Sequence, residues 1–172
     1  MEEAQTTKSK FTVRDMAMIG VLAALGFAGN FIQFPIPTPL GATRLHLGNV
    51  MCLLSGLLLG PLPGGLAAGF GAMFYDFTNP LYINEAWITF LTKFAMAWLC
   101  GMIAWCKGAK AGRFKRNVAA TIGGAIFYLI LYMAKNLIQG LLLRMEWETI
   151  LVSLATKFGA SLFNGILAAV IT

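Results

Sequence analysis

The chain has 172 residues, of which 58% are apolar and only 12% are charged, and its formal net charge is +6. Soluble domains average about 45–50% apolar and about 25% charged residues, so this composition excludes an ordinary soluble domain and predicts a polytopic membrane protein. Each transmembrane helix needs about 20 apolar residues. The length therefore allows about six spans and leaves no room for a separate soluble domain.

Apolar segments separated by short polar loops predict an all-α integral membrane protein that forms one six-helix domain over residues 1–172. The expected transmembrane helices cover residues 12–34, 46–60, 64–77, 87–106, 118–143 and 150–172. The second and third are short, because about 15 residues span only about 22 Å of a hydrocarbon core of about 30 Å. Three arrangements of this pair remain open: crossing a thinned region, leaning on longer neighbours, or forming a re-entrant hairpin.

The first helix carries small residues at a spacing of four, at Gly20, Ala24 and Ala28. Such stripes allow close approach of another helix in lipid. The partner is either another helix of this chain or a separate subunit. Three prolines follow, Pro35, Pro37 and Pro39, and we expect them to end the helix and stiffen a loop.

Basic residues gather in two places, before the first helix and between the fourth and fifth helices. They are Lys8, Lys10, Arg14, Lys107, Lys110, Arg113, Lys115 and Arg116. With six helices, both groups fall on one side, and the opposite loops carry only Arg44 and Arg144. The positive-inside rule makes the basic side cytoplasmic, so both termini are expected inside and the loops after helices 1, 3 and 5 outside.

Three lysines, Lys93, Lys135 and Lys157, lie inside apolar segments. Each is six to eight residues from the outer end of its helix, which places all three roughly 9–12 Å below the outer boundary. Charged residues at such depth are expensive and indicate a functional site. Snorkelling to the interface, or pairing with an acidic residue such as Asp76 or Glu85, would be a purely structural explanation.

Polar and aromatic residues accompany these lysines at helical spacing. They are Tyr132, Asn136 and Gln139 with Lys135, and Ser161 and Asn164 with Lys157. Apolar walls with a few convergent polar groups are typical of small-molecule pockets, so we predict an outward-opening ligand pocket. Its positive charge favours a ligand with a carboxylate, a phosphate or an electron-rich heterocycle.

Further candidate contacts lie at the ends of the hairpin formed by residues 44–76 and at the predicted outer boundary. They are Arg44, His46, Asn49, Asp76, Trp87 and Trp147. The tryptophans would stack on a ligand ring, although an interfacial aromatic belt explains them equally well. His46 is expected to be a hydrogen-bonding group at a helix start rather than a metal ligand.

The sequence carries none of the HExxH, GxSxG or GxxxxGK[ST] motifs. We therefore expect no catalytic residue, metal or cofactor, and no nucleic acid partner. Without a phosphate loop the chain cannot drive ATP-powered transport alone. The weaker alternatives are a small membrane enzyme using Asp76 with His46, or a stand-alone secondary carrier or channel for a small anion.

Several stretches carry a family resemblance. They are His46-Leu-Gly-Asn49, Leu58-Leu-Gly60-Pro61, Gly64-Gly65-Leu-Ala-Ala-Gly69-Phe-Gly71, Asp76, Lys93 within Ile88-Thr-Phe-Leu-Thr-Lys-Phe, and the AxxxA pattern Ala24-Leu-Gly-Phe-Ala28. Together they resemble the substrate-binding S component of energy-coupling factor (ECF) vitamin transporters, of the riboflavin, vitamin B6 or hydroxymethylpyrimidine type.

The resemblance implies a prokaryotic plasma-membrane protein, surrounded by membrane lipid, that captures a vitamin or its precursor from outside at high affinity. It implies that helices 4–6 and the outer loops form the binding site. It also implies that a membrane coupling subunit and two ATPase subunits supply the energy, with the small stripe of helix 1 as the docking face.

Overall fold

The computed structural model describes residues 11–108 and 111–172, so Lys8, Lys10 and Lys110 of the basic groups lie outside the described residues. Six α-helices follow one another through the described residues: α1 (Val13–Phe31), α2 (Gly48–Leu59), α3 (Pro61–Thr78), α4 (Ala86–Ala104), α5 (Phe114–Leu142) and α6 (Trp147–Ile171). Short 3-10 turns precede and follow α4, η1 (Ile83–Glu85) and η2 (Cys106–Gly108). The predicted helical membrane protein with six helices is confirmed.

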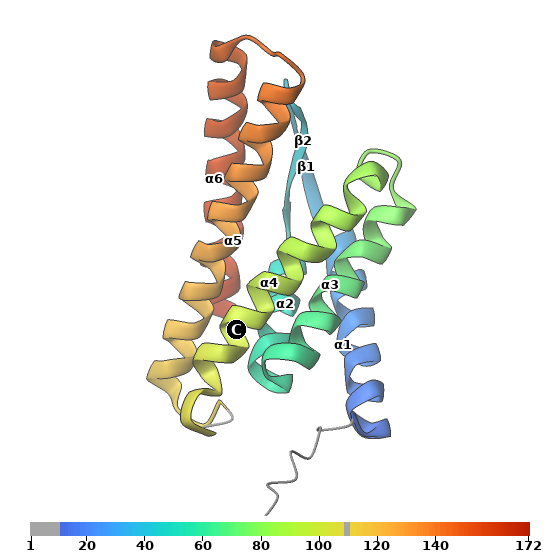
Figure 1. Cartoon of the computed structure of the whole chain (residues 1–172), viewed down its shortest axis with the longest axis vertical. Coiled ribbons are helices and arrows are strands. Elements are labelled where there is room, and N and C mark those ends of the chain that lie inside the picture. The colour runs from blue at the N-terminus through green and yellow to red at the C-terminus, as the bar shows by residue number, and fades with distance from the viewer. Residues whose placement is uncertain (1–10, 109–110) are drawn as a thin grey trace, which may run out of the picture.

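The helices form an elongated bundle in which α5 and α6 run together along one side (Figure 1). The α4 helix packs against both α3 and α5, while α1 packs against α3. The short α2 lies among the others, in contact with α1, α3, α4 and α6. Among the described residues, α1, the segment Ile83–Ala104, α5 and α6 are each long and apolar enough to cross a membrane.

The helix bounds differ from prediction most clearly at α3, which begins at Pro61 and has 18 residues. Residues 61–63, Pro61-Leu62-Pro63, were expected to link the second and third helices. Proline is in fact well suited to the first turn of a helix, where its missing N–H has no intrahelical partner. The expectation that this third helix is as short as the second is therefore wrong, and only α2, with 12 residues, is clearly short.

Residues 33–46 form an antiparallel β-ribbon that the sequence analysis did not predict. Strand β1 (Gln33–Thr38) pairs with β2 (Gly41–His46), with Pro39 and Leu40 at the turn. The predicted first helix, 12–34, therefore ends at Phe31, and the second, 46–60, begins at Gly48. Because Pro35 and Pro37 are two residues apart, their missing N–H groups face the same edge of β1, which leaves the other edge free to pair with β2.

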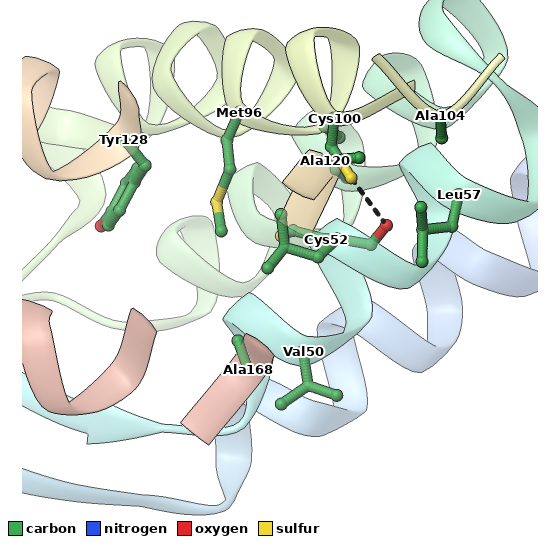
Figure 2. Close-up of a cluster of buried hydrophobic side chains, with 12 residues drawn as sticks. Val50, Cys52, Leu57, Met96, Cys100, Ala104, Ala120, Tyr128 and Ala168 are labelled. Atoms are coloured by element: carbon green, nitrogen blue, oxygen red, sulfur yellow. Dashed lines mark hydrogen bonds between the residues drawn. The ribbon is translucent and has the colours of Figure 1, made fainter. Parts of the chain in front are cut away.

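The core lies around α2, as Figure 2 shows. Val50, Leu53 and Leu57 of α2 pack against Met96 and Cys100 of α4. The cluster also includes residues of α3, α5 and α6: Ala68, Ala120, Tyr128 and Ala168. Tyr128 has a second role, because its ring also forms part of the polar chamber described below.

Glycine in α3 allows the neighbouring helices to approach its backbone. A Cβ atom on Gly71 would lie 2.5 Å from the backbone oxygen of Ala23 in α1, whereas one on Gly20 would have no atom within 4 Å. Gly71→Ala is therefore expected to force α1 and α3 apart and to lower the free energy of unfolding by about 1–3 kcal/mol. Gly20→Ala, the matched control, is expected to be neutral or slightly stabilising.

Thermal unfolding of the two variants in detergent checks this prediction. Equal unfolding midpoints for Gly71→Ala and Gly20→Ala would contradict the close packing of α1 on α3.

Candidate ligand-binding site

A small polar cavity lies between β2, the end of α3, and helices α4, α5 and α6; we call it the inner chamber. Its volume is about 50 Å³. Its walls include Thr43, Arg44, His46, Asp76, Tyr82, Glu85, Thr89, Thr92, Lys93, Tyr128, Tyr132, Lys135, Ser161 and Asn164. Most of these residues are charged or able to hydrogen-bond, although the helices around them are apolar.

A larger open cavity of about 950 Å³, the vestibule, adjoins the inner chamber. The two share six wall residues, so they lie directly next to each other: Ala42, Tyr82, Glu85, Ile88, Tyr132 and Lys135. The vestibule is lined by the turn of the β-ribbon, the α3–α4 connection and the α5–α6 connection, which meet at one end of the bundle (Figure 1). A molecule would therefore reach the inner chamber from this end.

Arg44 is held rigidly at the chamber wall. Its Nη2 donates to Oδ1 of Asp76 at 2.8 Å. Its guanidinium also lies over two rings, 4.7 Å from the centroid of Tyr75 and 4.3 Å from that of Tyr82. Asp76 is 1% exposed, so the ion pair is buried. The Nη1 atom has no hydrogen-bond partner among the described residues, which leaves a fixed, unused donor.

Lys93 is 2% exposed and reaches the chamber from α4. Its Nζ donates to Oδ1 of Asn49 and lies 3.8 Å from the centroid of the Tyr128 ring. The ion pairs of the described residues are Arg44–Asp76 and Lys135–Glu85. Lys93 is thus a buried cation that forms no ion pair with a carboxylate in the described part of the chain.

Lys135 and Lys157 have different environments. Lys135 pairs with Glu85, whose Oε1 also accepts from Nε2 of Gln139 at 3.2 Å. The burial of Lys135 within an apolar helix is therefore explained by its ion pair with Glu85 and needs no ligand. Lys157 donates to the backbone oxygen of Leu40 and to Oδ1 of Asn136, both at 2.6 Å. It therefore fixes the turn of the β-ribbon against α5 and α6.

The second strand is tied to the helices at two further points. Nδ2 of Asn164 donates to the backbone oxygen of Arg44 at 2.8 Å, and Oδ1 of Asn164 accepts from the backbone N–H of His46 at 3.0 Å. The hydroxyls of Thr43 and Tyr132 lie 3.2 Å apart. These contacts hold β2 as one wall of the chamber.

His46 takes part in hydrogen bonding at the start of α2, as expected. Its Nδ1 accepts from the backbone N–H of Gly48 at 3.0 Å. An atom that accepts an N–H carries no proton, so Nε2 bears the hydrogen in the neutral ring. Asp76 pairs with Arg44 rather than with His46. The acid–base pair that an enzyme would need is therefore not formed by these two residues.

Tyr82 lies outside the membrane-spanning helices, between α3 and η1. Burial raises the pKa of its phenol, so the group stays protonated at neutral pH. Its hydroxyl has no hydrogen-bond partner among the described residues. It is therefore a second unused polar group at the junction of the chamber and the vestibule.

Most of the predicted contacts come together. The chamber or vestibule is lined by Arg44, His46, Asp76, Lys93, Tyr132, Lys135, Gln139, Lys157, Ser161 and Asn164. Asn49 and Asn136 lie behind the wall and orient Lys93 and Lys157. Trp87 and Trp147 are not among the lining residues; they are 67% and 59% exposed on the outside of the bundle. Their exposure fits side chains of an interfacial aromatic belt better than side chains that stack on a ligand.

Three lining residues were not predicted from the sequence, namely Thr43, Thr89 and Thr92, and Glu85 was considered only as a structural partner of the lysines. Thr89 lies four residues before Lys93 and three residues before Thr92, so helical spacing carried a signal for both threonines. Thr43 had no such signal, because its position depends on the β-ribbon.

The small-residue stripe of α1 faces outward. Gly20, Ala24 and Ala28 are exposed, whereas the buried face of the helix consists of Leu22, Gly26, Gly29 and Asn30. The alternative in which the stripe packs inside this chain is therefore wrong. The described residues leave it as a free surface.

The fold defines a helical, multi-pass membrane protein whose helices enclose a polar cavity. The family model described as "ECF-type riboflavin transporter, S component" matches residues 10–172. The chain belongs to this family, and the resemblance read from its motifs is confirmed. The family is a class of transporter components rather than of enzymes.

A solved bacterial structure has the same fold. It is described as "Structure and mechanism of the S component of a bacterial ECF transporter". The TM-score is 0.60 at 21% sequence identity, and the alignment covers 92% of this chain and 90% of that chain. None of the curated proteins compared with the chain matches it.

Proposed function

We propose that this chain is the substrate-capture subunit of an ECF-type importer for a vitamin or vitamin precursor. The observation that carries the proposal is the inner chamber, a polar and largely buried cavity inside an apolar bundle, which lies next to an open vestibule. Such a site suits capture of a small molecule. The chain belongs to a family of transporter components, so we assign the captured molecule as the one that is transported.

The vestibule faces the extracellular side in this proposal. Arg14, Arg113, Lys115 and Arg116 lie at the start of α1 and α5, toward the end of the bundle opposite the vestibule (Figure 1). Basic residues favour the cytoplasmic side. This charge distribution supports cytoplasmic termini and a ligand that enters from outside.

The energy comes from partner subunits. The chain has no phosphate loop, and the outward stripe of Gly20, Ala24 and Ala28 is a surface on which a helix of a membrane coupling subunit can pack closely. Two ATPase subunits bound to that coupling subunit would drive release of the ligand into the cell. The host is then a prokaryote that carries such an ECF module.

Reconstitution tests the proposal. We expect proteoliposomes that contain this chain alone to bind a vitamin without accumulating it. Accumulation is expected to require the coupling subunit, both ATPases and ATP, and the tagged chain should co-purify with these partners. Uptake by the chain alone without ATP would instead favour a stand-alone carrier. Absence of both vitamin binding and partner association would refute the proposal.

A further inference from the structure

The inner chamber has more positive than negative groups. Its walls carry three cations, Arg44, Lys93 and Lys135, and two carboxylates, Asp76 and Glu85. Both carboxylates are already used, by Arg44 and Lys135 respectively. Lys93 is the cation left without a carboxylate among the described residues. A buried cation is expensive without an opposite charge, so the ammonium of Lys93 is a charge in the chamber that an anionic ligand can compensate.

The unused polar atoms of the chamber also point to an anion. The Nη1 of Arg44 and the hydroxyls of Ser161 and Tyr82 are buried without hydrogen-bond partners among the described residues. Ser161 is only 6% exposed. The His46 ring contributes an N–H on Nε2, because its Nδ1 is used by Gly48. The free groups are thus mainly donors, and a carboxylate or phosphate offers two or three strong acceptor oxygens to such a set.

The size of the chamber limits which part of a ligand fits. A water molecule needs about 10–15 Å³ of such volume, so about 50 Å³ holds about four atoms of that size. This is room for a carboxylate or phosphate group and not for a fused ring system. The vestibule, at about 950 Å³, has room for the rest of a vitamin-sized molecule.

We infer that the transported ligand carries a carboxylate or phosphate group that binds in the inner chamber against Lys93, Arg44 and Ser161, while its ring or chain lies in the vestibule. The inference rests on the proposed function, since it names the ligand class of the same site. The ligand is a soluble molecule rather than a lipid, because the chamber opens to the vestibule formed by the three loops.

Matched pairs of compounds test the charge requirement. The protein is placed in nanodiscs of zwitterionic lipid, and dissociation constants are measured calorimetrically for riboflavin and riboflavin 5′-phosphate, pyridoxal and pyridoxal 5′-phosphate, and biotin amide and biotin. We expect the anionic member of at least one pair to bind at least tenfold more tightly than its neutral counterpart. Lys93→Met is expected to reduce this preference to less than threefold.

Lys115→Met is the matched control, because Lys115 is exposed near the start of α5 and lines neither cavity. It should keep the full preference. The comparison in the wild-type protein needs no variant, so the test stands even if Lys93→Met does not fold.

The binding experiment distinguishes failure of this inference from failure of the proposed function. If, in every pair that binds, the neutral member binds as well as its anionic counterpart, or better, this inference is overturned and the proposed function stands. If no compound binds to protein that circular dichroism shows to be folded, this inference is overturned. The proposed function is overturned with it if the tagged chain also fails to co-purify with the coupling subunit and the ATPases. Competition between the preferred compound and added phosphatidylglycerol would place a lipid phosphate in the chamber and overturn the assignment to a soluble ligand.

Discussion

Ala24→Trp is expected to lower ATP-dependent uptake at least tenfold while leaving the dissociation constant of the ligand within about threefold of the wild-type value. Ala24 is exposed in the middle of the outward stripe of α1 and lines neither cavity. Close helix packing in lipid depends on small residues at the interface. An indole there would hold the coupling subunit away without reaching the chamber.

The matched control is Leu25→Trp. Leu25 is 45% exposed on the same helix but lies beside the stripe, and it is already large. Uptake by this variant should stay near the wild-type rate. Loss of ligand binding in Ala24→Trp would show that the stripe supports the fold of this chain, and unchanged uptake would show that it is not the docking face.

Arg44→Met is expected to have the largest effect on the protein alone. It leaves the carboxylate of Asp76, which is 1% exposed, buried without its guanidinium partner. Breaking a buried ion pair on one side costs about 3–5 kcal/mol. For a domain of this size, the loss corresponds to a fall of on the order of 10 °C in the thermal unfolding midpoint. Ligand binding should be lost as well.

A double variant separates the two effects. Arg44→Met with Asp76→Asn removes both charges, so much of the stability should return, but binding should not, because the Nη1 donor is still missing.

Lys135→Met is the control for the second ion pair. Its partner Glu85 is 30% exposed, and a pair open to solvent contributes less than about 1 kcal/mol. Equal unfolding midpoints for Arg44→Met and Lys135→Met would contradict the role of the buried pair.

The sequence predicted the helical part of the fold because apolar runs and the bilayer thickness limit the alternatives. It also predicted that Arg44 and Asp76 lie at the same end of the α2–α3 hairpin, which is a consequence of the turn at Gly60. It could not show that Tyr75 and Tyr82 enclose Arg44. Such an arrangement depends on how α3 and its following loop are oriented around the ribbon.

The β-ribbon was the main feature that the sequence concealed. Proline at every second position from Pro35 to Pro39 indicates a loop on helix-stop rules, and these residues do not show the apolar–polar alternation of a typical strand. The pairing with β2 depends on Leu40, Thr43 and Arg44 being fastened to helices α5 and α6. The residues that they contact lie between 89 and 120 positions later in the chain, and such distant contacts are not visible in a local pattern.

The predicted membrane depth of the three lysines indicated their positions but not their functions. Counting from the helix ends placed Lys93, Lys135 and Lys157 at one level, and all three line the chamber or the vestibule. Their different functions followed only from their partners. Lys135 is paired with Glu85, Lys157 fastens the ribbon, and Lys93 keeps an uncompensated charge.

Mass spectrometry of the small molecules released from the purified, denatured protein tests the central claim most directly. We predict that one vitamin or vitamin precursor with a carboxylate or phosphate group is released from the wild-type protein in near-equimolar amount. It should be absent from the Arg44→Met, Asp76→Asn double variant purified in the same way. Equal amounts from both proteins, or no enriched compound from the wild-type protein, would contradict the assignment of the inner chamber as the site of ligand capture.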